Sequence, residues 1–141
     1  MKQDWKEELD YIEEEKRRAY ECAESAYNAE PCLRTARLKA LAEREYDVAK
    51  AHNIAIGEKV SECIYSDWHS YTICSRTRDV LYARADRQLA FKKSFEDGER
   101  FCEEDPNAKP VRFTWSKLFQ RWVRKGYTVI VGEYNYEDPT F

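Results

Sequence analysis

Apolar side chains recur at every third or fourth residue over most of the chain, from Trp5 to Phe101, and this is the period of one face of an α-helix. The stripe of the first segment, about residues 3–30, is Trp5, Leu9, Ile12, Ala19, Ala23 and Ala26. Pro31 ends that segment, because proline disfavours a helical residue before it and has no N–H to donate. We expect these apolar side chains to turn inward together and to leave no room for a reaction centre.

A second helical segment is predicted from about Cys32 to Cys74, and a third from Ser75 or Thr77 to about Asp105. The second carries Leu38, Leu41, Ala42, Tyr46, Ala49, Ile56, Val60, Ile64, Trp68 and Tyr71 at helical spacing, and the third carries Val80, Leu81, Leu89, Phe91, Phe95, Phe101 and Cys102. Asn53 and Gly57 both suit a helix end, so we expect a break or kink there. The small number of Gly and Pro residues, four of each, also disfavours a fold of many strands.

The pattern changes after a linker at residues 106–110. Val111–Trp115 and Tyr127–Val131 have the composition of β-strands. Between them, residues 116–125 predict a short amphipathic helix, with Ser116 as its N-cap and Gly126 just past its end. Two strands alone are only marginally stable in water, so this unit is expected to pack on the helices or to pair with another chain.

The predicted fold class is therefore mainly α. Residues 1–105 form a bundle of three or four long helices, and residues 106–141 form a small strand–helix–strand (α+β) appendage packed on that bundle. The first part holds 18 basic and 24 acidic residues, a net charge of −6, whereas the second holds six and three, a net charge of +3. The two parts are expected to present surfaces of opposite sign.

The protein is predicted to be cytoplasmic. No apolar run approaches the roughly 18 residues that cross a membrane, and the charged N-terminus lacks the apolar core of a signal peptide. The five cysteines include no CxxC pair, so free thiols in a reducing compartment are expected.

Residues that could support catalysis or metal binding do not form a recognisable set. Cys63 and Cys74 would share a helical face, but His69 would point away from both and a fourth ligand is missing, so no metal site is predicted. His52 and His69 are the only histidines, and the four isolated glycines cannot build a phosphate loop. We therefore expect no cofactor and no enzymatic activity.

The best candidate binding surface is the predicted helix after Trp115 with its flanks. Its basic and aromatic residues are Arg112, Trp115, Lys117, Arg121, Trp122, Arg124, Lys125 and Tyr127. Such a mixture could hold phosphates and stack bases, could dock on an acidic protein surface, or could be an ordinary solvated face over a packed one. The acidic first helix is a second candidate, which could dock on a basic groove.

Three functions are compatible with these features. The first is a non-catalytic interaction protein that binds and blocks or regulates another protein or a protein–nucleic-acid complex, as phage-encoded inhibitors of host nucleic-acid machinery such as anti-CRISPR proteins do. Tyr, Trp and Arg are common anchors of such interfaces. The second is a direct nucleic-acid-binding protein, and the third is a small enzyme whose site forms only in the fold. A homodimer through the Tyr127–Val131 strand is a further expectation.

Overall fold

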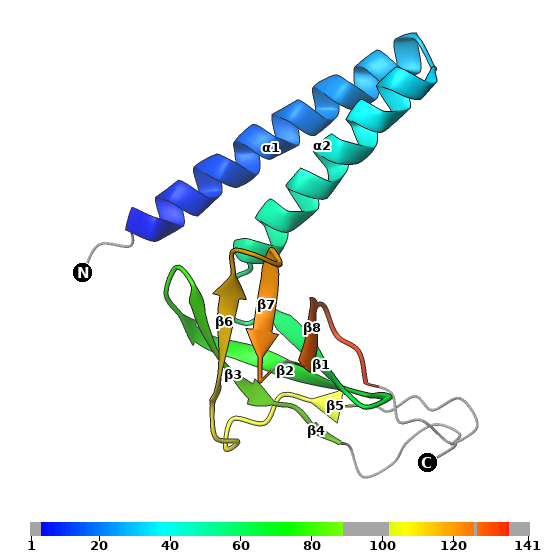
Figure 1. The fold of residues 1–141 in the computed structure, drawn as a ribbon. Helices are drawn as coiled ribbons and strands as arrows, with labels where there is room; N and C mark the ends of the chain where they lie inside the picture. The colour runs from blue at the N-terminus through cyan, green and yellow to red at the C-terminus, as the bar shows by residue number, and fades with distance from the viewer. Residues whose placement is uncertain (1–3, 89–101, 126, 136–141) are drawn as a thin grey trace. The chain divides into compact units, whose positions relative to one another are not determined.

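The structure, a computed structural model, describes residues 4–88, 102–125 and 127–135. The chain divides into two compact units, Met1–Asn53 and Ile54–Phe141. The first contains two helices and the second is built of strands (Figure 1). The predicted bundle of three or four long helices is therefore wrong, because the helical period after residue 53 does not correspond to helices. Within the described residues, no helix is both long enough and apolar enough to cross a membrane.

The first unit is a helical hairpin of α1 (Asp4–Ala29) and α2 (Leu33–His52). Helix α1 confirms the first predicted helix, and Asp4 and Glu7 in its first turn suit the positive end of the helix dipole. In the turn, the Thr35 hydroxyl donates to the Glu30 carbonyl at 2.8 Å. Helix α2 ends at His52, so the break expected at residues 53–57 is found at the beginning of that stretch.

The seam between the two helices is mostly polar and aromatic. Tyr20 stacks on Tyr46 with ring centroids 6.1 Å apart, and the Nζ of Lys39 lies 5.0 Å from the centroid of the Tyr27 ring. Within the described helices, Leu9 and Ala49 are the only fully buried apolar residues. The hairpin therefore leaves most of its apolar side chains partly or fully exposed.

The second unit is a closed antiparallel barrel with the strand order β1-β2-β3-β6-β7-β8. The strands are β1 (Lys59–Ile64), β2 (Asp67–Arg76), β3 (Val80–Ala85), β6 (Val111–Ser116), β7 (Arg121–Arg124) and β8 (Tyr127–Val131). Pairing of β1 with β8 closes the barrel. Two further strands, β4 (Arg87–Gln88) and β5 (Cys102–Glu103), form a separate two-stranded sheet.

Strands β1, β2 and β3 occupy sequence that was predicted to be helical. The barrel core consists of Ile54, Val60, Tyr71, Ile73, Leu81, Ala83, Phe113, Trp122 and Val129. Pairs such as Tyr71 and Ile73 are two residues apart, which is the period of a strand. The third predicted helix is wrong over Val80–Gln88, and its remaining apolar positions from Leu89 to Phe101 lie outside the described residues.

The C-terminal prediction was right for both strands and wrong for the helix between them. Strands β6 and β8 coincide with the two predicted strands, but residues 117–120 form a turn and Arg121–Arg124 form β7. All three strands belong to the same barrel as β1. Strand β8 pairs with β1 along one edge and with β7 along the other. The edge that the expected homodimer would use is thus already paired within the chain, and dimerisation itself stays a prediction.

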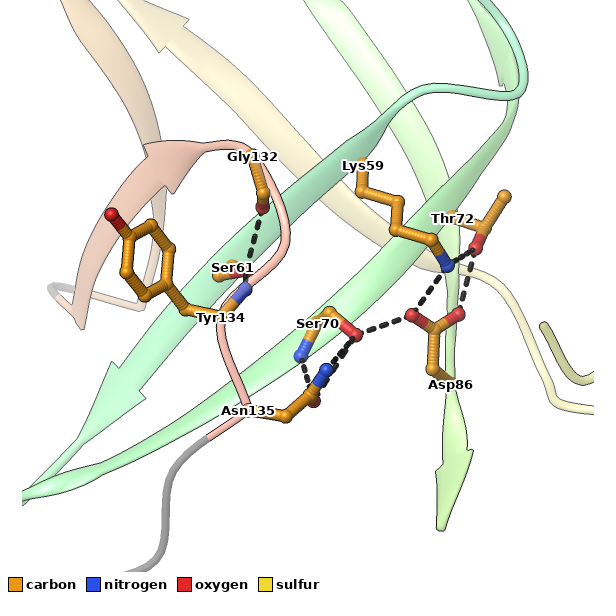
Figure 2. Close-up of polar contacts among 8 residues, drawn as sticks. All are labelled: Lys59, Ser61, Ser70, Thr72, Asp86, Gly132, Tyr134 and Asn135. Atoms are coloured by element: carbon orange, nitrogen blue, oxygen red, sulfur yellow. Dashed lines mark hydrogen bonds and ion pairs between the residues drawn. The ribbon is translucent and has the colours of Figure 1, made fainter. Parts of the chain in front are cut away.

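Residues 132–135 lie across the outer face of β1 and β2 (Figure 2). The hydroxyl of Ser61 donates to the Gly132 carbonyl at 2.7 Å and accepts from the Tyr134 amide at 2.8 Å. The Asn135 side chain bonds both the amide and the hydroxyl of Ser70. These bonds explain how two serines on a barrel surface are almost fully buried.

Candidate functional site

The barrel separates the eight predicted binding residues into two groups. Trp115, Trp122, Arg124 and Tyr127 are buried or half-buried, whereas Arg112, Lys117, Arg121 and Lys125 are exposed. Strand alternation causes this division within the strands, because neighbours along a strand point to opposite faces, and Lys117 and Lys125 are exposed in turns. The prediction placed all eight on one surface, and the structure brings only the four exposed cations to solvent around the β6–β7 hairpin.

The two tryptophans of this set belong to the barrel interior. Trp115 pairs with Trp122 across β6 and β7, and their rings meet edge-to-face with centroids 5.2 Å apart. Trp122 is in the core, and Trp115 packs against it. Trp122, buried in the core, cannot stack on a nucleic-acid base without opening the barrel.

Arg124 is held by a fully buried carboxylate, that of Glu62 on β1. Its Nη1 atom donates to both Glu62 oxygens, at 2.9 and 3.0 Å, and the Tyr71 hydroxyl donates to Oε1 of the same group at 3.0 Å. The Glu62 side chain has no exposed surface, and that of Arg124 is 18% exposed. A buried carboxylate is stable only when it is paired and hydrogen-bonded in this manner. The cluster therefore fixes β1, β2 and β7 to one another.

The same cluster predicts how stability changes at alkaline pH. Burial raises the pKa of Tyr71 to about 12, and the Glu62 carboxylate adds to this rise. A tyrosine in the unfolded chain titrates near pH 10, so folding keeps the Tyr71 proton between pH 10 and 12. Its contribution to the free energy of unfolding is complete below pH 10, and it falls by up to about 1.4 kcal/mol per pH unit above it. Urea unfolding of wild type and Tyr71→Phe at several pH values checks this.

The Tyr71→Phe variant should lose less unfolding free energy than wild type as the pH rises above 10, whatever its stability at neutral pH. Tyr82, exposed on β3, provides the control, and Tyr82→Phe should keep the wild-type slope. Equal slopes in wild type and Tyr71→Phe would contradict the assignment.

A second buried carboxylate, Asp86, lies between β3 and β4 on the outside of the barrel (Figure 2). It accepts from Lys59 Nζ at 2.7 Å and from the Thr72 hydroxyl at 2.7 Å, and the Ser70 hydroxyl donates to it as well. Ser70 in turn is bonded to Asn135. This network joins β1, β2 and the segment at residues 132–135.

These two clusters contain the types of residue used in acid–base and nucleophilic chemistry, but they do not present them to a substrate. Glu62, Asp86 and the Ser70 hydroxyl are buried, and each is hydrogen-bonded to other side chains of the protein. A nucleophile or a general base must reach the reacting atom within hydrogen-bond distance. Among the described residues, no group of three or more His, Cys, Asp or Glu side chains could hold a metal ion. We therefore assign both clusters a structural role.

The most distinctive exposed feature of the barrel is the turn between β6 and β7. Ser116 begins it, accepting from the Phe119 amide at its hydroxyl (3.1 Å) and from the Gln120 amide at its carbonyl (2.7 Å). Gln120 then adopts a left-handed φ of 54°, which turns the chain back into β7. The side chains of Leu118 and Phe119 consequently project to solvent and are 83% and 63% exposed.

Two cations flank this apolar tip, and two more lie toward the other end of the hairpin. Lys117 and Arg121 flank it, with the Arg121 guanidinium 5.3 Å from the centre of the Phe119 ring, and Arg112 and Lys125 are exposed farther along the hairpin. No acidic residue occurs between Pro106 and Gly132. We call Arg112, Lys117, Leu118, Phe119, Arg121 and Lys125 the basic hairpin, and it is the candidate functional site.

The prediction missed the two residues at the centre of this site, Leu118 and Phe119, because both fall within the short amphipathic helix expected at residues 116–125. Their spacing from Trp122 is helical, and only the turn at Gln120 separates them from the core. Glu62 and Asp86 were also missed, since nothing in a single sequence distinguishes a buried carboxylate from an exposed one.

The chain was also compared with known proteins. No protein-family model, curated protein or solved structure matches it.

Proposed function

We propose that the protein is a non-catalytic interaction protein that binds an acidic surface of another protein through the basic hairpin, and thereby blocks or regulates that partner. The observation that carries this proposal is the pair of exposed apolar side chains, Leu118 and Phe119, at a tip flanked by Lys117 and Arg121. The narrower hypothesis of a phage-type inhibitor of host nucleic-acid machinery stays a prediction.

The composition of the tip supports a protein partner. Protein interfaces commonly combine apolar or aromatic anchors with arginine, and their rim charges steer association. An exposed leucine and phenylalanine gain most when a partner removes them from water, by about 1.5–3 kcal/mol for each side chain fully buried. The surrounding cations favour an acidic rim on that partner.

Direct nucleic-acid binding is the alternative, and the positions of the aromatic residues weigh against it. Single-stranded nucleic acids bind to basic grooves with several aromatic rings on which successive bases stack. Of the two tryptophans expected to do this, Trp122 is buried in the barrel core and Trp115 is half-buried against it. Phe119 is the one exposed aromatic residue of the basic hairpin.

The proposal can be tested with a photo-crosslinking amino acid placed at position 119 and expressed in the native host. We expect one dominant protein adduct. The double variant Lys117→Glu/Arg121→Glu in the same background should reduce that adduct at least about tenfold, since charge complementarity across an interface is worth on the order of 1 kcal/mol or more per pair. Mass spectrometry identifies the adduct and quantifies it.

Two controls separate binding at the basic hairpin from non-specific crosslinking and from a general effect of net charge. A crosslinker at Tyr82, exposed on β3, should not give the same adduct. The variant Arg18→Glu/Lys50→Glu changes net charge equally on α1 and α2, and it should leave the position-119 adduct intact. An adduct to nucleic acid would support the alternative function, and the absence of any specific adduct would contradict both.

Arg124 is unsuitable for such a test, although its position in the sequence suggests it. Replacing it with glutamate would place a second carboxylate beside buried Glu62. Loss of binding in that variant would report on folding.

A further inference from the structure

We propose that the helical hairpin is a self-association surface on which a second copy of this chain packs antiparallel, so that the tip of each hairpin lies beside the base of the other. This proposal uses α1 and α2 alone. It is independent of the basic hairpin, which lies in the other unit.

The first observation is an exposed apolar face on α2. Leu33, Leu38 and Leu41 are 65%, 51% and 56% exposed. Leu38 and Leu41 line an open groove of about 420 Å³, whose α1 wall is Cys22, Ala23 and Ala26. Leu33 and Leu38 line an adjoining hollow with Arg34 and Arg37. Two helices cannot by themselves bury such a face, and helices with apolar stripes are stabilised mainly by packing against others.

The second observation is the distribution of charge along the hairpin. Residues 4–15 of α1, at its base, contain seven acidic residues and Lys6, a net charge of −6. Residues 33–44 of α2, at its tip, contain Arg34, Arg37, Lys39 and Arg44 with a single acid, Glu43, a net charge of +3. Packing α2 of each copy antiparallel on α1 of the other brings this basic stretch of α2 against the acidic stretch of α1, whereas a parallel copy would place the two acidic α1 stretches side by side. Charge complementarity therefore favours a second copy of this chain as the partner and an antiparallel arrangement of the two hairpins.

Placing the two-fold axis of the proposed dimer at the midpoint of α1 gives the pair a definite register. At 1.5 Å per residue α1 is about 39 Å long, and a two-fold axis through its midpoint pairs positions at equal distances from the two ends. Because α2 runs back beside α1 from the turn at residues 30–32, Leu41 of one copy would then lie near Ile12 of the other, Arg37 near Glu8 and Arg44 near Glu15. Ile12 belongs to the apolar stripe that continues to Ala23 and Ala26 in the groove wall. The register that pairs opposite charges thus also places the apolar side chains of one copy on those of the other.

The first test is the mass of the full chain in solution, measured by sedimentation or light scattering from micromolar concentration upward. We expect a species of twice the 16.8 kDa chain mass. Leu38→Glu/Leu41→Glu should give a monomer with unchanged helical circular dichroism, since both side chains are more than half exposed. The matched control Leu118→Glu/Phe119→Glu alters the basic hairpin and should leave the dimer intact. The proposal is wrong if the wild type is a monomer. It is also wrong if the control variant loses the dimer while the leucine variant keeps it.

The second test addresses direction, with two complementary charge reversals. Arg37→Glu/Arg44→Glu and Glu8→Lys/Glu15→Lys should each weaken self-association by at least about tenfold. Mixing the two variants should restore association as a heterodimer, because every reversed residue then meets its reversed partner. If the mixture associates no better than either variant alone, the antiparallel register is wrong. Neither outcome depends on the adduct at position 119, so this proposal and the proposed function can fail separately.

Discussion

The variant Arg124→Ala is expected to lose about 3–5 kcal/mol of unfolding free energy, which is the usual cost of removing one member of a buried ion pair. The truncation takes from the Glu62 carboxylate, which has no exposed surface in the wild type, its cationic partner, and among the described residues Tyr71 remains as its side-chain partner. A loss of this size is comparable to the whole stability of many small domains. Urea unfolding followed by tryptophan fluorescence measures it, because Trp115 and Trp122 report on the barrel.

Arg121→Ala is the matched control, since Arg121 is on the same strand and is exposed. Its loss should stay within about 0.5 kcal/mol, as is usual for surface substitutions. The double variant Glu62→Leu/Arg124→Leu should recover much of the stability that Arg124→Ala loses, because it removes both buried charges together. Similar losses in the Arg124 and Arg121 variants would show that the ion pair does not hold the barrel.

The extent to which sequence predicts this fold differs between its two units. Helix α1 was predicted almost to the residue, since it has no interior Gly or Pro, begins with acidic residues and stops before Pro31. In β1 and β2 the pattern was ambiguous. Val60, Ile64, Trp68 and Tyr71 are three or four residues apart, as on a helix, although they come from two paired strands. In β1 the side chains of Val60 and Glu62, two residues apart, both point into the barrel. The sequence does not show this alternation, because one of the two inward residues is charged.

Turn chemistry explains the remaining errors. The tight turns of a barrel often need a positive φ, and glycine or asparagine is the usual signal of one. Here Tyr65, Gln120 and Lys125 adopt φ values of 58°, 54° and 50°. With these positions occupied by ordinary residues, the chain shows few hairpin signals, and its low glycine content was misinterpreted as evidence against strands. The left-handed Gln120 alone converts the predicted helix at residues 116–125 into a hairpin.

The candidate site was predicted in part for the same reason. Composition alone identified the cluster of cations at residues 112–125, because it requires no knowledge of the fold. Which of them reach solvent depends on strand alternation, and the partner of Arg124 is 62 residues away at Glu62. Contacts of that separation are set by the barrel's pairing, which no local pattern contains.

The second large effect is expected at Asp86, where we predict that Asp86→Asn loses about 2–4 kcal/mol of unfolding free energy. Its carboxylate accepts hydrogen bonds from Lys59, Ser70 and Thr72 and has no exposed surface. An amide of the same shape turns one of the two acceptors into a donor. At least one of the three hydrogen-bond donors then loses its acceptor. The Lys59 ammonium also loses the negative charge that balances it. Each such loss costs roughly 1–3 kcal/mol when it occurs in a buried site.

The neighbouring pair Arg87–Glu103 provides the comparison that makes this result specific. Arg87 Nε donates to Glu103 at 2.7 Å, but both side chains are about half exposed. Glu103→Gln removes a carboxylate as Asp86→Asn does, yet it should cost no more than about 1 kcal/mol, because water replaces the lost interaction and screens it. The contrast between the two variants, measured by urea unfolding under identical conditions, isolates burial as the cause. If both lose the same amount, the network at Asp86 contributes no more than an ordinary surface ion pair, and the bonds of Ser61 and of the Ser70 amide hold residues 132–135 on β1 and β2 without it.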